Sequence, residues 1–297
     1  MDHNLKDIAK IDIAAFSDKG TVRGNNEDNL FSNTVDITNR NSADLFKREI
    51  SIEYSNEAMI FAVFDGIGGT YGGEIASFHA ARVFSDMSDE IAETEMKDFP
   101  SVLEKLKDRI EKNILVEEGF TTKNMPGTTC CAFLLREGKV LPFWIGDSRI
   151  YMLRGNRLIL LTKDHTIAQE KIDYGVISPE EATSISGWHH LTAYVGDLHS
   201  KFAIGTEFEL EAGDRFLLCS DGISDKFSAS EIANYMNNGI ETCLDLFEKE
   251  VSDESKDNAT ALLIEFRKSE LHSLRDAIKK RTKECVDVVI SSAKNLE

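Results

Sequence analysis

Acidic residues recur in this sequence where apolar runs give way to glycine or asparagine. Five segments share the pattern: Asn25-Asn26-Glu27-Asp28, Asp65-Gly66-Ile67-Gly68-Gly69, Gly146-Asp147-Ser148-Arg149, Ser220-Asp221-Gly222-Ile223-Ser224-Asp225 and Asp257-Asn258-Ala259-Thr260. Singly, each is explained by turn chemistry, because Asp and Asn cap turns and Gly supplies positive φ. Together they place carboxylates at strand ends, from which all can project from one edge of a sandwich.

Carboxylates gathered at one edge would repel one another unless cations lay among them. Hard divalent cations prefer oxygen ligands, and Mg²⁺ keeps several waters, so a few carboxylates suffice for each ion. Two ions about 3.5–4 Å apart can share one carboxylate and one bridging water, which then loses a proton more easily and becomes the nucleophile. Arg23, five residues before Asp28, is either an ordinary surface arginine or a bidentate phosphate ligand at the rim of such a site.

Bulk composition narrows the function classes. The 297 residues include 34 Lys and Arg against 52 Asp and Glu, which gives a formal net charge of −18. This charge argues against nucleic acid as a partner, because its phosphates would be repelled. No apolar run approaches the ~20 residues of a membrane span, and the polar start lacks the apolar core of a signal peptide. We therefore expect a cytoplasmic protein without membrane contacts, whose five cysteines are mostly buried and reduced.

Hydrophobic periodicity indicates the elements that must position the acids. We expect strands over 11–17, 29–33, 59–64, 128–136, 139–146, 149–154, 157–162, 208–210, 215–220 and 258–266, and helices over 74–91, 100–114, 230–237 and 242–251. The first two strands could pair, and the tight connections at 137–138, 147–148 and 155–156 predict consecutive hairpins. Residues 36–56 are expected to be an irregular surface insertion. The pattern alone leaves α+β and an α/β/β/α sandwich open.

Seven motifs, in this order between about Ile11 and Arg267, resemble those of the metal-dependent type 2C serine/threonine phosphatases. They are Arg23-x-x-Asn26-Glu27-Asp28, Asp65-Gly66-x-Gly68-Gly69, Gly127-Thr128-Thr129, Gly146-Asp147-Ser148-Arg149, Leu161-Thr162-x-Asp164-His165, Ser220-Asp221-Gly222 and Asp257-Asn258-x-Thr260. The resemblance implies an α+β fold, a four-layer α/β/β/α sandwich of two antiparallel sheets flanked by helices. It also implies a phosphatase domain over 1–267 with a flap at about 163–205, followed by a C-terminal helical extension over 268–297.

The resemblance implies two Mg²⁺ or Mn²⁺ ions as cofactors, with a third, weaker ion. Asp65 is implied to bridge the two ions, and the backbone carbonyl of Gly66 to bind one of them. Asp221 and Asp257 are implied to bind the other ion.

Further roles carried by the resemblance concern water and substrate. Glu27 and Asp28 are implied to hold metal-bound waters, and Arg23 to grip the substrate phosphate. Asp147 with Asp221 is similar to the pair that holds the third ion in bacterial members of the family.

One position separates this chain from many eukaryotic members, which have a histidine, a proposed general acid, where Ile67 stands. Bacterial members usually carry an apolar residue there, so the chain resembles the bacterial branch. Ile67 has no proton to donate. We expect the leaving alkoxide to take its proton from a metal-bound water, including one on the third ion.

The predicted function is metal-dependent hydrolysis of phosphoserine and phosphothreonine in proteins. Two alternatives remain: a catalytically weak regulator of the same fold that binds phosphoproteins, and a hydrolase of small phosphate esters. The presence of every expected acid argues against the first alternative. The second depends on the shape of the flap, which determines which substrates can reach the site. The implied partners are phosphoprotein substrates and a cognate serine/threonine kinase. We expect a monomer whose tail either caps the domain or mediates contacts.

Overall fold

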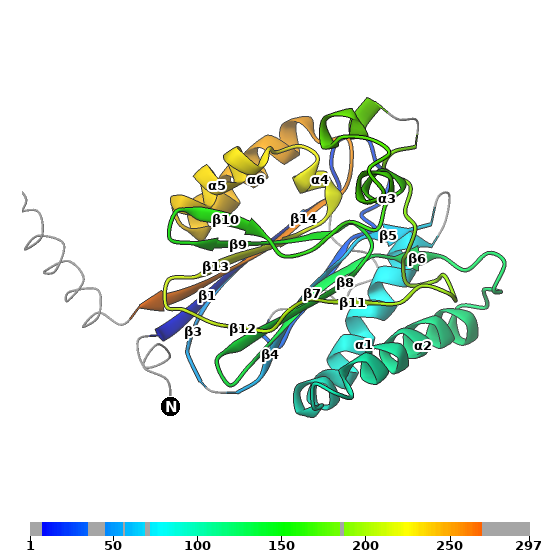
Figure 1. Ribbon diagram of the computed structural model, residues 1–297, viewed down its shortest axis with the longest axis horizontal. Coiled ribbons are helices and arrows are strands. Elements are labelled where there is room, and N and C mark those ends of the chain that lie inside the picture. The colour runs from blue at the N-terminus through cyan, green and yellow to red at the C-terminus, as the bar shows by residue number, and fades with distance from the viewer. Residues whose placement is uncertain (1–7, 35–44, 56, 69–71, 185–186, 269–297) are drawn as a thin grey trace, which may run out of the picture.

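Two antiparallel sheets lie face to face in the computed structural model, and helices cover the outer face of each (Figure 1). The structure describes residues 8–34, 45–55, 57–68, 72–184 and 187–268. The expected α+β fold, a four-layer α/β/β/α sandwich, is thereby confirmed.

The first sheet has the strand order β10-β9-β13-β14-β1-β3. Its strands are β1 (Ile8–Asp18), β3 (Leu45–Glu53), β9 (Arg149–Arg154), β10 (Arg157–Leu160), β13 (Arg215–Cys219) and β14 (Ala259–Lys268). Helices α5 (Ala229–Asn237) and α6 (Ile240–Glu254) cover its outer face.

The second sheet has the order β11-β8-β7-β4-β2, and β12 also pairs with β8. Its strands are β2 (Asn29–Ser32), β4 (Met59–Phe64), β7 (Cys130–Arg136), β8 (Lys139–Ile145), β11 (Ala203–Ile204) and β12 (Phe208–Glu209). Helices α1 (Gly73–Glu93) and α2 (Phe99–Glu117) cover it. A short pair, β5 (Gly66–Ile67) with β6 (Gly127–Thr128), extends this layer beyond β4.

Strand β4 shows why its run is continuously apolar. Alternate side chains on a strand point to opposite faces, and both faces of β4 are buried. Phe61 joins the core between the sheets, where its ring lies 4.9 Å from that of Phe133. Phe64 faces the helices, where its ring lies 4.9 Å from that of Phe84 on α1.

Strand pairing differs from expectation at three places. Strand β2 pairs with β4 and not with β1, so the first two strands belong to different sheets. The connection at 147–148 crosses from β8 in one sheet to β9 in the other and is not a hairpin. Residues 45–53, expected to be irregular, form the edge strand β3, which pairs with β1. Its outward face is exposed, which dilutes the apolar signal.

Two smaller expectations concern the thiols and the tail. Cys130, Cys131, Cys219 and Cys243 are buried and free, as expected. Strand β14 ends at Lys268, and the rest of the predicted extension lies outside the described residues. Within the described ranges, no helix has both the length and the apolar composition that crossing a bilayer requires.

Candidate metal centre

The predicted acids meet at one end of the sandwich because of strand direction. Asp65 follows β4 and Asp147 follows β8, two strands that both run antiparallel to β7. In the other sheet Asp221 follows β13, and Asp257 precedes the antiparallel strand β14. Strand β1 also ends at this edge, since Asp18 pairs with Ala259. Figure 1 shows β5, β6, α3 (Ile167–Asp173) and α4 (Asp221–Ser224) gathered there.

A pocket of about 200 Å³ lies at this edge. It is lined by Arg23, Glu27, Asp65, Gly66, Ile67, Gly68, Thr129, Asp147, His189, Leu191, Asp221, Asp257 and Asn258. All the predicted site residues except Asp28 therefore face one cavity. Asp28 is fully buried and does not line the pocket.

Asp28 is positioned by a serine that sequence reasoning did not single out. The Ser220 hydroxyl donates to Asp28 Oδ2 at 2.7 Å, and Ser220 Oγ accepts from the Thr260 amide at 2.9 Å. The other oxygen of Asp28, Oδ1, is buried and has no hydrogen-bond partner among the described residues. The available signal was local, because Ser220 immediately precedes Asp221 in a predicted motif.

The loop that carries Arg23 and Glu27 is fixed to the start of β14 by Asn258. Its side-chain amide donates to the carbonyls of Lys19 and Asn25, each at 2.9 Å. Its side-chain oxygen accepts from the Glu27 amide at 2.9 Å. Asn258 thereby sets where the loop's charged side chains can reach.

Two threonines hold Asp65. The Thr129 amide donates to the Asp65 carbonyl at 2.8 Å, and the Asp65 amide donates to Thr129 Oγ1 at 3.0 Å. The Thr128 hydroxyl donates to the same carbonyl at 2.9 Å. Thr129 Oγ1 also lies 2.7 Å from the hydroxyl of Ser148, beside Asp147. The turns that carry Asp65 and Asp147 are thus fixed to each other.

Gly66 is required by the close approach of α1. A Cβ at Gly66 would lie 2.4 Å from the Gly73 carbonyl oxygen and 2.5 Å from that of Glu27. A Cβ at Gly73 would lie 2.4 Å from Glu27 Oε2. Both glycines are needed for the first turn of α1 to lie against β5 and the Glu27 carboxylate.

Arg23 and Asp257 form an ion pair at the rim. Arg23 Nη2 lies 2.6 Å from Asp257 Oδ2, and both side chains remain about half exposed. The guanidinium is therefore on the pocket side of its loop and next to a predicted metal ligand. An exposed ion pair contributes little to stability, so its exchange for another partner costs little.

Burial and mutual repulsion raise the pKa values of the clustered carboxyls. For Asp65, burial raises the pKa well above its ordinary value, and the charges of Asp28 and Asp221 raise it further. Burial also raises the pKa of Asp147 well above its ordinary value, and the charge of nearby Asp221 raises it further. Burial raises the pKa of Asp221 to about 6, with a further contribution from Asp257. These groups resist ionisation together unless positive charge is supplied.

The donor set fits divalent cations. The carboxylates of Glu27, Asp65, Asp147, Asp221 and Asp257 face one small polar pocket together with Gly66, and oxygen is the ligand that Mg²⁺ and Mn²⁺ prefer. The charges of Asp28 and Asp221 act on Asp65, so positive charge in the pocket would stabilise the ionised forms of these side chains. As the side chains stand, no three or more His, Cys, Asp or Glu residues within the described ranges form a group that could hold a metal ion. Metal binding would therefore require some of these side chains to change position.

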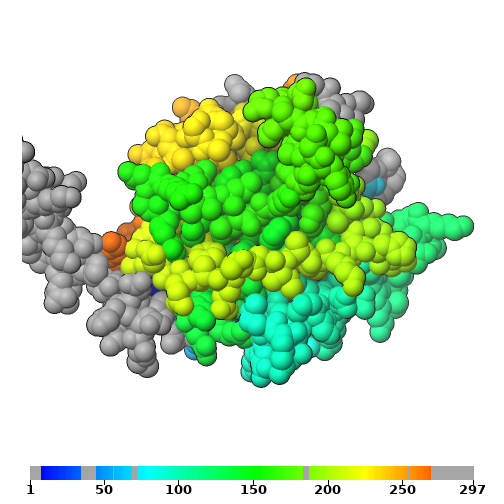
Figure 2. Space-filling model, viewed as in Figure 1, coloured from blue at the N-terminus to red at the C-terminus, as the bar shows by residue number. Residues whose placement is uncertain are grey.

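The segment 163–205 stands beside the pocket and is fixed at its start. Arg149 makes a two-pronged contact with Asp164, with Nη2 to Oδ2 at 2.6 Å and Nε to Oδ1 at 3.0 Å. The His165 amide donates to the Gly146 carbonyl at 3.0 Å, and the Gly146 amide donates to His165 Nδ1 at 3.1 Å. These bonds place the segment next to Asp147. Figure 2 shows the green atoms of this part of the chain standing out as a lobe at the upper right.

The same segment brings His189 and Leu191 to the pocket. From the sequence, the adjacent histidines at 189 and 190 were interpreted as part of a polar loop. They do lie in a turn and are exposed, but His189 also faces the acidic cavity. Sequence spacing carried no signal for this, because the contact depends on how the segment folds back.

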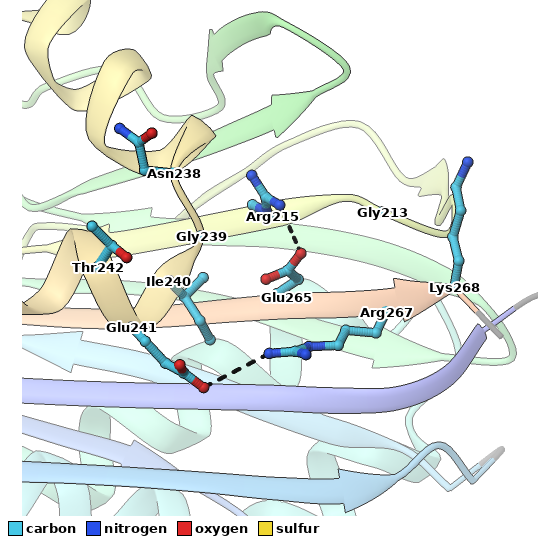
Figure 3. A pocket seen from close by; sticks show the side chains of 10 residues that line it. All are labelled: Gly213, Arg215, Asn238, Gly239, Ile240, Glu241, Thr242, Glu265, Arg267 and Lys268. Carbon is cyan, nitrogen blue, oxygen red and sulfur yellow. Dashed lines mark ion pairs between the residues drawn. The ribbon is translucent and has the colours of Figure 1, made fainter. Parts of the chain in front are cut away.

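A second pocket, of about 510 Å³, lies at the opposite end of β14 from Asp257 (Figure 3). Its two arginines are already paired: Arg215 Nη2 lies 2.8 Å from Glu265 Oε1, and Arg267 Nη2 lies 3.7 Å from Glu241 Oε1. None of the predicted site residues lines it. The acidic pocket, although smaller, is the chemically distinctive one.

Comparison with known proteins gives a consistent family. The family described as "Protein phosphatase 2C" matches residues 39–257. The serine/threonine phosphatase stp of Listeria welshimeri is 30% identical over 257 residues, which cover 84% of this chain and 93% of that protein. The serine/threonine protein phosphatase PstP of Mycobacterium tuberculosis is 33% identical over 224 residues, 74% of this chain but only 37% of the relative's length.

Solved structures agree with the fold. The crystal structure of Mycobacterium tuberculosis PstP/Ppp has a TM-score of 0.68 and 28% identity, and the match covers 87% of this chain and 99% of that one. The catalytic domain of PstP in complex with two manganese ions has a TM-score of 0.64 and 29% identity, covering 86% and 98%. The fold, the order of the acidic residues along the chain and the family match over residues 39–257 together show that this chain belongs to the protein phosphatase 2C family.

Proposed function

We propose that this protein is a metal-dependent phosphatase that hydrolyses phosphoserine and phosphothreonine in proteins. The observation that carries the proposal is the convergence of four carboxylates, Asp65, Asp147, Asp221 and Asp257, on one pocket beside the Arg23 guanidinium. Paired oxygen ligands for cations and a bidentate phosphate donor are what phosphate-ester hydrolysis requires.

The proposed cofactors are two Mg²⁺ or Mn²⁺ ions and a third, weaker ion. Asp65 is the proposed ligand of both ions, the Gly66 carbonyl would bind the first, and Asp221 and Asp257 would bind the second. Asp147 is proposed to join Asp221 at the third. When bound, such ions lower the pKa of water and neutralise the charge of a phosphoryl group.

The remaining side chains bind and orient. Arg23 would release Asp257 and hold the phosphate, since its planar fork fits two phosphate oxygens. Glu27 and Asp28 are proposed to orient water, Asp28 with its free Oδ1 and its hydroxyl contact to Ser220. Ile67 lines the pocket without a proton to give, and we propose that water protonates the leaving oxygen.

The domain and partner assignments belong to the same proposal. We propose one phosphatase domain over 1–267, with the segment 163–205 as the flap that shapes substrate access, and an extension from 268. Phosphoproteins are the proposed substrates, and a serine/threonine kinase that supplies them is the proposed functional partner.

Hydrolysis of p-nitrophenyl phosphate and of phosphothreonine peptides with manganese tests the proposal. We expect both to be cleaved by the wild type and neither by Asp65→Asn. Asp86→Asn is the matched control, because Asp86 is an exposed helix residue paired with Arg109. No release at any manganese concentration would favour the phosphoprotein-binding regulator. Cleavage of the small ester without any peptide cleavage would favour the small-ester hydrolase.

A further inference from the structure

An uncharged pocket of about 430 Å³ adjoins the acidic one. It is lined by Ile67, Gly68, Phe120, Asn124, Met125, Pro126, Gly127 and Tyr194. None of these residues carries a charge, in contrast to the acidic pocket. Ile67 and Gly68 line both pockets, so the two cavities share a wall that begins one residue after Gly66.

Three of the residues that line this uncharged pocket, Phe120, Pro126 and Tyr194, lie very close to glycines. A Cβ at Gly72 would lie 3.0 Å from the Pro126 side chain and 3.2 Å from Phe120 Cζ. A Cβ at Gly127 would lie 2.5 Å from Tyr194 Cδ2. The rings of Phe120 and Tyr194 thus lie directly against the backbone of these two glycines.

Two residues that line this pocket also contact the hydrophobic core. Phe120 and Met125 pack against the apolar cluster between the second sheet and α1 and α2. Both are only half-buried, so each presents one side to the core and one to the cavity. An uncharged cavity of this size with the side chains of Ile67, Phe120, Met125 and Tyr194 in its lining holds a large apolar side chain more favourably than a charged one.

We propose that this pocket binds a large apolar side chain of the phosphoprotein substrate, within a few residues of the phosphorylated serine or threonine. The inference rests on the proposed function, because the phosphate must occupy the acidic pocket for the neighbouring chain to cross the shared wall. An extended chain spans about 3.3–3.6 Å per residue, so residues close to the phosphorylated one reach the adjoining cavity.

Paired phosphothreonine peptides test the subsite. Each pair carries either Leu or Ala at a single position from four residues before to four residues after the phosphothreonine, and kcat/KM is measured with manganese. We expect Leu to be preferred about tenfold at one position or at two neighbouring positions, as an added apolar group in a fitting pocket provides. Equal values for Leu and Ala at every position would overturn the subsite.

Variants locate the preference. In Phe120→Ala and Met125→Ala the ratio of kcat/KM for Leu and Ala peptides should fall close to one. Met96→Ala is the matched control, because Met96 is exposed and does not line the pocket, and it should keep the wild-type ratio. Since Ala variants at half-buried positions can lose stability, Met125→Lys provides a second reading. It should reverse the preference, so that a Glu peptide exceeds the Leu peptide at the same position.

The outcomes separate this inference from the proposed function. If the wild type cleaves neither p-nitrophenyl phosphate nor any peptide, the proposed function itself fails. If it cleaves both, and the Leu preference survives in Phe120→Ala and Met125→Ala as it does in Met96→Ala, the function stands and the subsite lies elsewhere.

Discussion

The hydroxyl of Ser220 donates to the carboxylate of Asp28 at 2.7 Å, across 192 residues of chain, in a fully buried position. Asp28 immediately precedes β2 in the second sheet, and Ser220 follows β13 in the first, so this bond ties the two sheets together at the edge that carries the pocket. It also leaves Asp28 Oδ1 as the oxygen without a partner among the described residues.

Replacing Ser220 should weaken metal binding, although Ser220 does not itself line the pocket. In Ser220→Ala, Asp28 loses its hydroxyl donor, and we expect manganese affinity to fall about 10–100-fold, as for other groups that orient ligands. The free energy of unfolding should fall by about 1–3 kcal/mol. Calorimetric titration and thermal unfolding measure the two effects.

Ser224→Ala is the control for that variant. Ser224 lies on α4 near the same edge, and within the part of the chain that the structure describes its hydroxyl has no hydrogen-bond partner. We expect both quantities to stay close to wild type. Equal losses in the two variants would contradict the role assigned to the Ser220 hydroxyl.

Arg23→Lys should affect substrate binding more than turnover. A lysine keeps the charge but loses the two-pronged geometry, so KM for p-nitrophenyl phosphate should rise about tenfold, from the energy of one charge-assisted hydrogen bond. Manganese affinity should not fall, because the substitution weakens a competitor for Asp257. Steady-state kinetics measure this, with Arg48→Lys on the exposed edge of β3 as the control. An unchanged KM would remove Arg23 from phosphate binding.

Without metal, the carboxylate cluster should make stability depend on pH. Burial raises the pKa of Asp28 to about 7 and that of Asp221 to about 6, above the ~3.9 of an unfolded chain. The protonated forms therefore favour the folded state. Their contribution is complete below about pH 4 and is lost as the pH rises through 6 to 7.

Manganese should reverse that loss, because it binds the ionised carboxylates of the folded state only. We expect the manganese-induced rise in Tm to be larger at pH 8 than at pH 5.5, and to be strongly reduced in Asp65→Asn. Thermal unfolding in chelator and in manganese at both pH values measures it. A rise in Tm that is the same at both pH values would contradict the assignment of these carboxylates as ligands.

Asp147→Ala tests the source of the leaving-group proton. Asp147 lies beside Asp221 in the pocket, while Ile67 offers no proton. We expect slower turnover of a phosphoserine peptide and an altered pH–rate profile, while most of the manganese-induced stabilisation remains. Unchanged turnover across the pH range would exclude a third-metal proton donor. His189→Gln is the companion variant, because His189 is the titratable side chain that the segment 163–205 brings to this pocket.

The sequence by itself determined the faces of the elements and the order of the acids. The wholly apolar run of β4 predicts burial on both of its faces. One apolar stripe in each of α1 and α2 predicts the two helices that cover the second sheet. Asp65 and Asp221 could be singled out because acid, glycine and strand end lie within a few residues of one another. Such signals are local, and periodicity records them directly.

Only the tertiary structure decided which segments meet. Strand β2 pairs with β4, and β3 pairs with the edge of β1 that β14 leaves open. These pairings depend on the faces and edges that the rest of the core leaves available. The bond between Ser220 and Asp28 and the wall shared through Ile67 join residues far apart in the chain. Periodicity states which way a side chain points, and not what it will meet there.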